Sequence, residues 1–164
     1  KMKDAGAELV YFGGVHTEGG LLARQMRDQG LQATLMSGDG IATAEFASIA
    51  GPAAEGTLMT FAPDPRKRPE AKGVLDTFEK KGISTEAYTL YSYAVVQILK
   101  QAAEAIQSTD PKKVAEQMRS GQEFDTVIGK ISFDEKGDVN RLDYTMYTWE
   151  KTDGDRITYV ETGS

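Results

Sequence analysis

The chain has 164 residues, a formal net charge of −6 and a sequence pI near 4.9. This acidic balance argues against nucleic-acid binding, which usually needs a basic face. The sequence contains no cysteine, which excludes a disulfide framework and a thiolate metal site, and no run of residues reaches the apolar length of a membrane span.

The first predicted elements are a strand, a helix and a second strand. Residues 9–12 form a short apolar run that ends at Gly13-Gly14, and Thr17 is predicted to cap the helix that follows. Gly30 is predicted to end that helix, and residues 33–36 are predicted to form a second buried strand. This spacing predicts two parallel neighbouring strands that are joined by a right-handed crossover.

A lone carboxylate, Asp39, follows the second strand between Gly38 and Gly40. In open α/β sheets, ligands bind beyond the carboxyl ends of the strands, and both Asp39 and the turn over residues 13–16 fall at that edge. The glycines let backbone approach a ligand closely, and Asp39 offers a fixed negative charge. A Gly-Asp-Gly run is also a common turn, so the residues alone leave a purely structural role open.

The rest of the chain alternates helices, loops and strands. Residues 86–107 give the strongest helical pattern, since apolar residues such as Leu90, Val95 and Leu99 recur at three- and four-residue spacing. The other predicted elements are a helix that Thr43 caps and that runs through Ile49, a strand over 57–61, a proline-rich loop over 62–69, a helix over 70–81, a helix that Asp110 caps with Pro111 at its first position, and strands over 127–133, 144–149 and 157–160.

Short sequence blocks follow one another in a specific order along nearly the whole chain. They are Tyr11-Phe12-Gly13-Gly14, Thr17-Glu18-Gly19, Arg24-Gln25, Ser37-Gly38-Asp39-Gly40, Ile49-Ala50-Gly51-Pro52-Ala53-Ala54-Glu55-Gly56, the segment 87–97, Thr126-Val127-Ile128-Gly129 and Phe133-Asp134-Glu135-Lys136-Gly137-Asp138. In this order they resemble the branched-chain amino-acid (Leu/Ile/Val) binding proteins of bacterial ABC importers, which are periplasmic binding proteins of type I.

The resemblance implies an α/β fold with three-layer, parallel-sheet lobes, of which this chain holds an incomplete, C-terminal portion. Residues 1–62 and 142–164 would belong to the second lobe, and residues 63–141 would belong to the first. The implied protein is periplasmic, loses a signal peptide on maturation, captures an amino acid by closure of its lobes and delivers it to the membrane permease of an ABC importer. It would be no enzyme and would need no cofactor.

The resemblance also assigns roles to four residues. Asp39 aligns with the acidic residue that grips the ammonium group of the ligand, a charged hydrogen bond that is typically worth ~1.5–3 kcal/mol. Tyr88 aligns with an aromatic residue that lines the amino-acid pocket, although it could equally be ordinary core. Val15 stands where branched-chain binders often carry a tyrosine, and the adjacent His16 could occupy part of that space or lie plainly on the surface.

Two other classes of function remain open from the residues. A ligand-sensing regulatory domain could use the same two-lobed fold, and a flavodoxin-like hydrolase domain is the enzyme alternative. A triad of His16, Ser37 and Asp39 would serve such an enzyme, but no nucleophile-elbow motif supports it. An upstream signal peptide would separate a transport component from a cytosolic regulator or enzyme.

Because the lobes would be incomplete, we expect two further properties of the chain alone, one for ligand binding and one for its assembly. The donors that hold the ligand carboxylate in the family lie on a part of the first lobe that is outside this chain, so the chain alone should bind amino acids weakly or not at all. Sheets without their neighbouring strands expose apolar edges. We therefore expect the chain alone to be oligomeric or paired with the missing half.

Overall fold

The computed structural model describes residues 1–141 and 143–162. Over this part, the chain divides into two compact units, which we call unit 1 (Lys1–Pro63 with Tyr144–Ser164) and unit 2 (Asp64–Asp143). That these units are parts of the second and first lobes of a binding protein stays a prediction.

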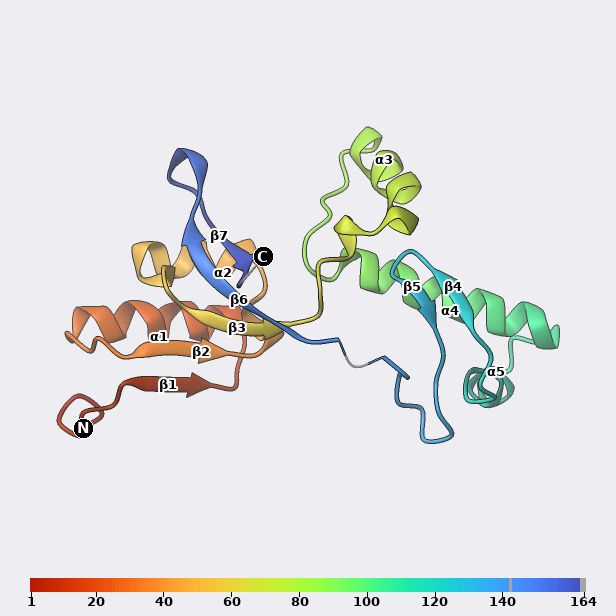
Figure 1. Cartoon of the computed structure of the whole chain (residues 1–164), viewed down its shortest axis with the longest axis horizontal. Coiled ribbons are helices and arrows are strands. Elements are labelled where there is room, and N and C mark those ends of the chain that lie inside the picture. Colours follow the sequence, from red (N-terminus) through yellow and green to blue (C-terminus); the bar gives the residue numbers. More distant parts are fainter. Residues whose placement is uncertain (142, 163–164) are drawn as a thin grey trace. The chain divides into compact units, whose positions relative to one another are not determined.

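Unit 1 is built on a five-stranded sheet with the order β1-β2-β3-β6-β7 (Figure 1). Its elements are β1 (Leu9–Phe12), α1 (His16–Asp28), β2 (Thr34–Ser37), α2 (Ala44–Ala50), β3 (Leu58–Phe61), β6 (Thr145–Lys151) and β7 (Ile157–Glu161), with 3-10 helices at Asp39–Ile41, Gly51–Ala54 and Asp153–Asp155. Strands β1 and β2 are parallel, as predicted, and β3 is parallel to β2, whereas β6 and β7 run antiparallel to their neighbours. The predicted α/β class is confirmed, with a mixed rather than a purely parallel sheet.

The helices α1 and α2 lie on one face of this sheet, because two successive right-handed crossovers in the same direction place their helices on the same side. Residues that point to this face are buried, among them Leu35, Met59 and Trp149. The Trp149 ring packs 4.9 Å from that of Phe46 on α2 and 5.2 Å from that of Tyr159 on β7. The core of unit 1 therefore lies between the sheet and the two helices, since Ala23 and Met26 of α1 are buried as well.

The predicted helix caps are partly confirmed. The side chain of Thr43 accepts a hydrogen bond from the backbone nitrogen of Glu45 at 3.3 Å, and Asp110 accepts from the nitrogens of Lys112 and Lys113 at 3.0 and 3.1 Å. The prediction for Thr17 is wrong. The N-cap residue of helix α1 is Val15, two residues before Thr17, so the helix begins at His16, and Val15 makes no side-chain cap.

In its described residues, 64–141 and 143, unit 2 contains three α-helices and a hairpin: α3 (Lys72–Lys80), α4 (Thr89–Ile106), α5 (Pro111–Met118), β4 (Phe124–Thr126) and β5 (Gly129–Ile131), with 3-10 helices at Pro65–Lys67 and Pro69–Ala71. The strand predicted over 127–133 is thus shorter, at Gly129–Ile131, and it pairs with β4, which the sequence analysis did not predict. Glutamines on α4 satisfy the backbone of the hairpin, since the Gln101 side chain exchanges hydrogen bonds of 3.1 and 2.9 Å with Asp125 and Gln97 accepts from Val127 at 2.9 Å.

One side of α4 supplies much of the core of unit 2. Ile98 and Ala102 are buried with Val114 and Phe124, while Leu90 and Ala94 are buried against the segment after β4 and the helix α3. The opposite side of α4 is exposed at Val95 and Leu99, which the periodicity of the sequence groups with the core residues.

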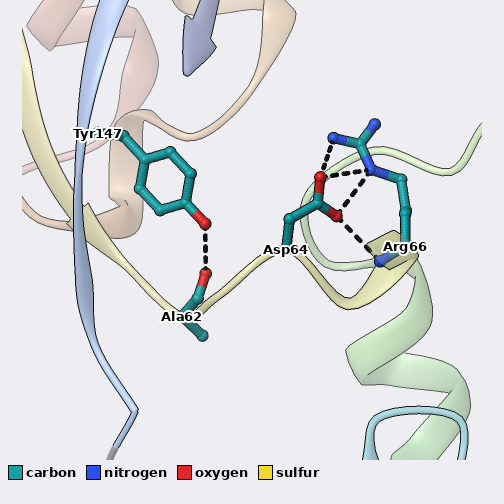
Figure 2. A network of polar contacts seen from close by, with 4 residues as sticks. All are labelled: Ala62, Asp64, Arg66 and Tyr147. Carbon is teal, nitrogen blue, oxygen red and sulfur yellow. Dashed lines mark hydrogen bonds and ion pairs between the residues drawn. The ribbon is translucent and has the colours of Figure 1, made fainter. Parts of the chain in front are cut away.

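The chain leaves unit 1 after β3 through a short connection that is held on both sides of Pro63 (Figure 2). In unit 1, the Tyr147 hydroxyl donates to the Ala62 carbonyl at 2.9 Å. In unit 2, the Asp64 carboxylate accepts from the backbone nitrogen of Arg66 at 3.0 Å and forms an ion pair with its guanidinium at 2.7 Å. The proline-rich loop predicted over 62–69 is thus ordered by local polar contacts.

Candidate functional site

The candidate site of unit 1 lies where β1 and β2 end. The last residues that β1 and β2 pair are Phe12 and Ser37. The loops that follow the two strands therefore begin side by side at the same edge of the sheet. The buried Ser37 hydroxyl donates to the Phe12 carbonyl at 2.8 Å and ties the two strand ends together. This is the carboxyl edge at which open α/β sheets bind ligands.

Close backbone contact joins the two loops at this edge. A Cβ on Gly40 would clash with the carbonyl oxygen of Gly14, and a Cβ on Gly14 would clash with the ring of Phe12. A side chain at position 40 would therefore displace the turn after β1, and a side chain at position 14 would displace the ring of Phe12. Of the glycines that the sequence singles out, Gly40 is therefore the one that lets the loop carrying Asp39 lie against the turn after β1.

Two of the predicted site residues, Asp39 and Val15, are exposed to solvent at this edge. Asp39 is exposed at the start of the 3-10 helix Asp39–Ile41, where its backbone carbonyl accepts from Ala42 at 2.9 Å. Val15 is exposed and extended (φ −108°, ψ 171°), immediately before α1. An exposed carboxylate and an exposed apolar side chain at one edge of the sheet match the needs of an amino acid, whose ammonium group and side chain must both be recognised.

His16 is half-buried and its imidazole is engaged by a neighbour. Its Nε2 lies 3.1 Å from the Oε2 atom of Glu45, which is in the first turn of α2. The pair therefore links the first turn of α1 to the first turn of α2, and Asp39 lies between these two helices in the sequence. Sequence reasoning missed Glu45, although an acidic residue two positions after the cap Thr43 is a typical helix-start signal.

Tyr88, the fourth predicted residue, belongs to unit 2. It is exposed and occupies the N-cap position of α4, where its carbonyl accepts from the backbone nitrogen of Ser92 at 2.8 Å. The structure thus brings Val15, His16 and Asp39 to one edge of unit 1 and places Tyr88 at the beginning of a helix in unit 2. That all four line one ligand site stays a prediction.

Tyr91 lies one turn beyond Tyr88 and was not singled out by the sequence. Burial raises the pKa of its hydroxyl, while the positive charges of Arg68 and Arg141 act against this shift. The hydroxyl therefore stays protonated at neutral pH and can donate a hydrogen bond.

Other features of the described residues do not extend this candidate site. No three histidine, aspartate or glutamate side chains in this part of the chain gather where they could hold a metal ion. None of the helices in residues 1–141 and 143–162 is long and apolar enough to cross a membrane. A hollow of about 510 Å³ lies between residues 1–4 and α1, and none of the four predicted site residues lines it.

Comparison with known sequences identifies close relatives. The pattern of the family described as "Periplasmic binding protein" matches residues 1–155. The chain is 53% identical over 161 residues to the Leu/Ile/Val-binding protein homolog 1 of Brucella suis, covering 98% of this chain and 43% of the relative. It is 47% identical over 152 residues to an amino acid binding protein of Pseudomonas aeruginosa, covering 92% of this chain and 40% of that protein. The chain thus spans less than half the length of these relatives.

Solved structures show the same fold. A leucine-binding protein from Thermotoga maritima superposes with a TM-score of 0.81 at 27% identity, covering 96% of this chain and 45% of that one. The substrate-binding protein of a branched-chain amino-acid transporter from Streptococcus pneumoniae, solved in complex with isoleucine, gives a TM-score of 0.68 at 21% identity, covering 94% of this chain and 44% of that one. Because the sequence identity to the Streptococcus pneumoniae protein is only 21%, this second similarity supports the fold and nothing further.

Proposed function

Since this chain belongs to the periplasmic binding protein family, we propose that it is part of a solute-binding protein for branched-chain or related amino acids. The observation that carries the proposal is the identity of 53% to a Leu/Ile/Val-binding protein homolog along nearly the entire chain. The solvent-facing carboxylate of Asp39 at the carboxyl edge of β1 and β2 supplies the acceptor that such a ligand requires.

In this proposal, Asp39 accepts hydrogen bonds from the ligand ammonium. Tyr88 would form an aromatic wall of the pocket, and Val15 would contact the ligand side chain without the hydroxyl that a tyrosine would bring. His16 contributes to the same wall while Glu45 holds its Nε2. Recognition by residues of both units is what closure of two lobes around a small ligand would require.

The whole protein would work in the periplasm after loss of its signal peptide. Its closed, loaded form would dock on the membrane permease of an ABC importer and release the amino acid there. The ligand would be carried and not chemically changed, so the protein would be no enzyme and would use no cofactor. The chain alone would be oligomeric or paired with the part of the protein that it lacks.

Calorimetric titration of the full-length protein that contains this chain tests the proposal. We expect saturable binding of leucine, isoleucine or valine. Replacement of Asp39 by asparagine should weaken this binding by roughly 10-fold or more, because a charged hydrogen bond to the ammonium becomes a neutral one. Asp28→Asn makes the same chemical change at an exposed position at the end of α1 and should leave the affinity unchanged.

Two results would contradict the proposal in different ways. If none of these amino acids binds to the wild-type protein, the assigned ligand class is wrong. If they bind and Asp39→Asn binds as tightly as the wild type, the ligand class stands and the role of Asp39 is wrong.

A further inference from the structure

Two arginines of unit 2 that are far apart in the sequence meet at one glycine. A Cβ on Gly129 would lie 3.3 Å from the Nη1 atom of Arg68 and 3.3 Å from the Nη1 atom of Arg141. The two nitrogens are therefore no more than twice that distance apart. Both arginines are half-buried, so the repulsion between their positive charges is screened less than it would be on an open surface. Like charges held this close call for compensating negative charge.

The nearby carboxylates supply only part of this compensation. Asp64 is engaged by the guanidinium of Arg66 at 2.7 Å (Figure 2), and Asp143 pairs with the Nε atom of Arg141. Within residues 64–141 and 143, no hydrogen bond or ion pair engages the guanidinium of Arg68. The fork of hydrogen-bond donors on Arg68 is therefore available to a ligand.

The turn against which the two arginines lie is held in place by its own hydrogen bonds. The Thr126 hydroxyl donates to the Gly129 carbonyl at 2.6 Å and accepts from the nitrogen of Ile128 at 3.2 Å, and the Nη1 atom of Arg141 donates to the Ile128 carbonyl at 3.4 Å. Gly129 is buried and has a φ of +92°, so a side chain there would be strained and would press on both guanidinium groups. Donors that are already held in place lose little freedom when they bind a ligand.

The Tyr91 hydroxyl lies within the field of the same two arginines. Burial raises the pKa of this hydroxyl, and the charges of Arg68 and Arg141 act on it in the opposite direction. Because the hydroxyl stays protonated at neutral pH, it adds no negative charge to offset the two guanidinium groups.

We propose that Arg68 and Arg141 form a binding site for a small oxyanion, either a phosphate or a dicarboxylate, which is held between their guanidinium groups. The planar fork of arginine matches the oxygen atoms of both kinds of anion, and the negative charge of the anion offsets the repulsion between the two arginines. Arg68 lies near the start of unit 2 and Arg141 near its end, so a bound anion ties these two segments of the chain together. The site goes beyond the proposed function and does not depend on the identity of the solute.

Thermal unfolding of the full-length protein without any amino acid tests the proposal. The protein is compared in potassium chloride and in potassium phosphate of equal ionic strength. At about 10 mM phosphate we expect the unfolding midpoint to lie a few degrees above its value in chloride, because a ligand that binds only the folded state stabilises it. In Arg68→Gln this rise should shrink to about 1 °C or less. Arg119→Gln removes an exposed arginine of the same unit and should keep the rise of the wild type.

A second arm with succinate in place of phosphate identifies the kind of anion. The larger rise assigns the site to phosphate groups or to dicarboxylates, and either result supports the proposal if Arg68→Gln abolishes it. In chloride alone, Arg68→Gln should unfold no lower than the wild type, because it removes one of two like charges. The proposal is overturned if neither anion raises the midpoint, or if all three proteins show the same rise, which would be a general salt effect. It is also overturned if Arg68→Gln lowers the midpoint equally in all three salts, since Arg68 would then only support the fold. No amino acid is present in these measurements, so failure here and failure of amino-acid binding are distinguishable.

Discussion

At the scale of single residues, two polar atoms in the core of unit 1 are buried at a cost in stability. The Thr57 hydroxyl and the indole nitrogen of Trp149 are buried and have no hydrogen-bond partner among the described residues. Both belong to side chains that are almost completely inaccessible. An unsatisfied buried hydroxyl loses its hydrogen bonds to water and gains none in return.

Replacement of Thr57 by valine should therefore stabilise the protein. Valine keeps the shape of the side chain and removes the unsatisfied hydroxyl, so we expect the free energy of unfolding to rise by about 1 kcal/mol. Urea denaturation followed by circular dichroism measures the change. Thr126→Val is the matched control, because the buried Thr126 hydroxyl donates to the Gly129 carbonyl at 2.6 Å and accepts from Ile128 at 3.2 Å. That variant should be destabilised, and an equal effect of both substitutions would contradict the argument.

At the scale of elements, the start of unit 2 depends on one carboxylate. Partial burial acts to raise the pKa of Asp64, but the hydrogen bonds and the charge of Arg66 outweigh it, so the pKa lies below its ordinary value of 3.8. Because the folded-state pKa is the lower one, the stabilisation is complete above pH 3.8 and is lost as the pH falls through the folded value.

Asp64→Asn should make this dependence visible. The amide keeps the cap on Arg66 and loses the charge, so the variant should be less stable than the wild type at neutral pH. That difference in unfolding free energy should shrink as the pH falls below 3.8. Denaturant titrations at neutral pH and at about pH 2.5 measure it. Asp76→Asn, at an exposed position of α3, is the control and should give no such trend, and a pH-independent difference for Asp64→Asn would show that its charge is not involved.

At the scale of the whole molecule, ligand affinity should depend on residues that this chain lacks. We expect the chain alone to bind leucine with a dissociation constant well above about 1 µM, if at all, and the full-length protein to bind it much more tightly. Titration of the two proteins under one set of conditions makes the comparison. Sub-micromolar affinity of the chain alone would mean that the residues of this chain suffice to hold the ligand.

Patterns confined to a few neighbouring residues were predicted well from the sequence. The parallel pair β1 and β2, the caps at Thr43 and Asp110 and the end of α1 near Gly30 all depend on contacts within a turn or on one crossover rule. Thr17 was placed wrongly because the helix begins without a side-chain cap, and its N-cap residue, Val15, lies two residues before the one that the capping pattern predicts.

The sequence by itself determined the α/β class, the family and the location of Asp39 after a strand. These follow from the hydrophobic period, the glycine turns and the order of the sequence blocks, which can be recognised without knowing any contact between distant residues. Only the tertiary structure decided that Gly40 lets two loops come into contact and that Glu45 holds His16. It also decided that Val95 and Leu99 face outward, although periodicity groups them with the core. Periodicity identifies an apolar side of a helix, but which of two apolar sides is buried depends on residues far away in the sequence.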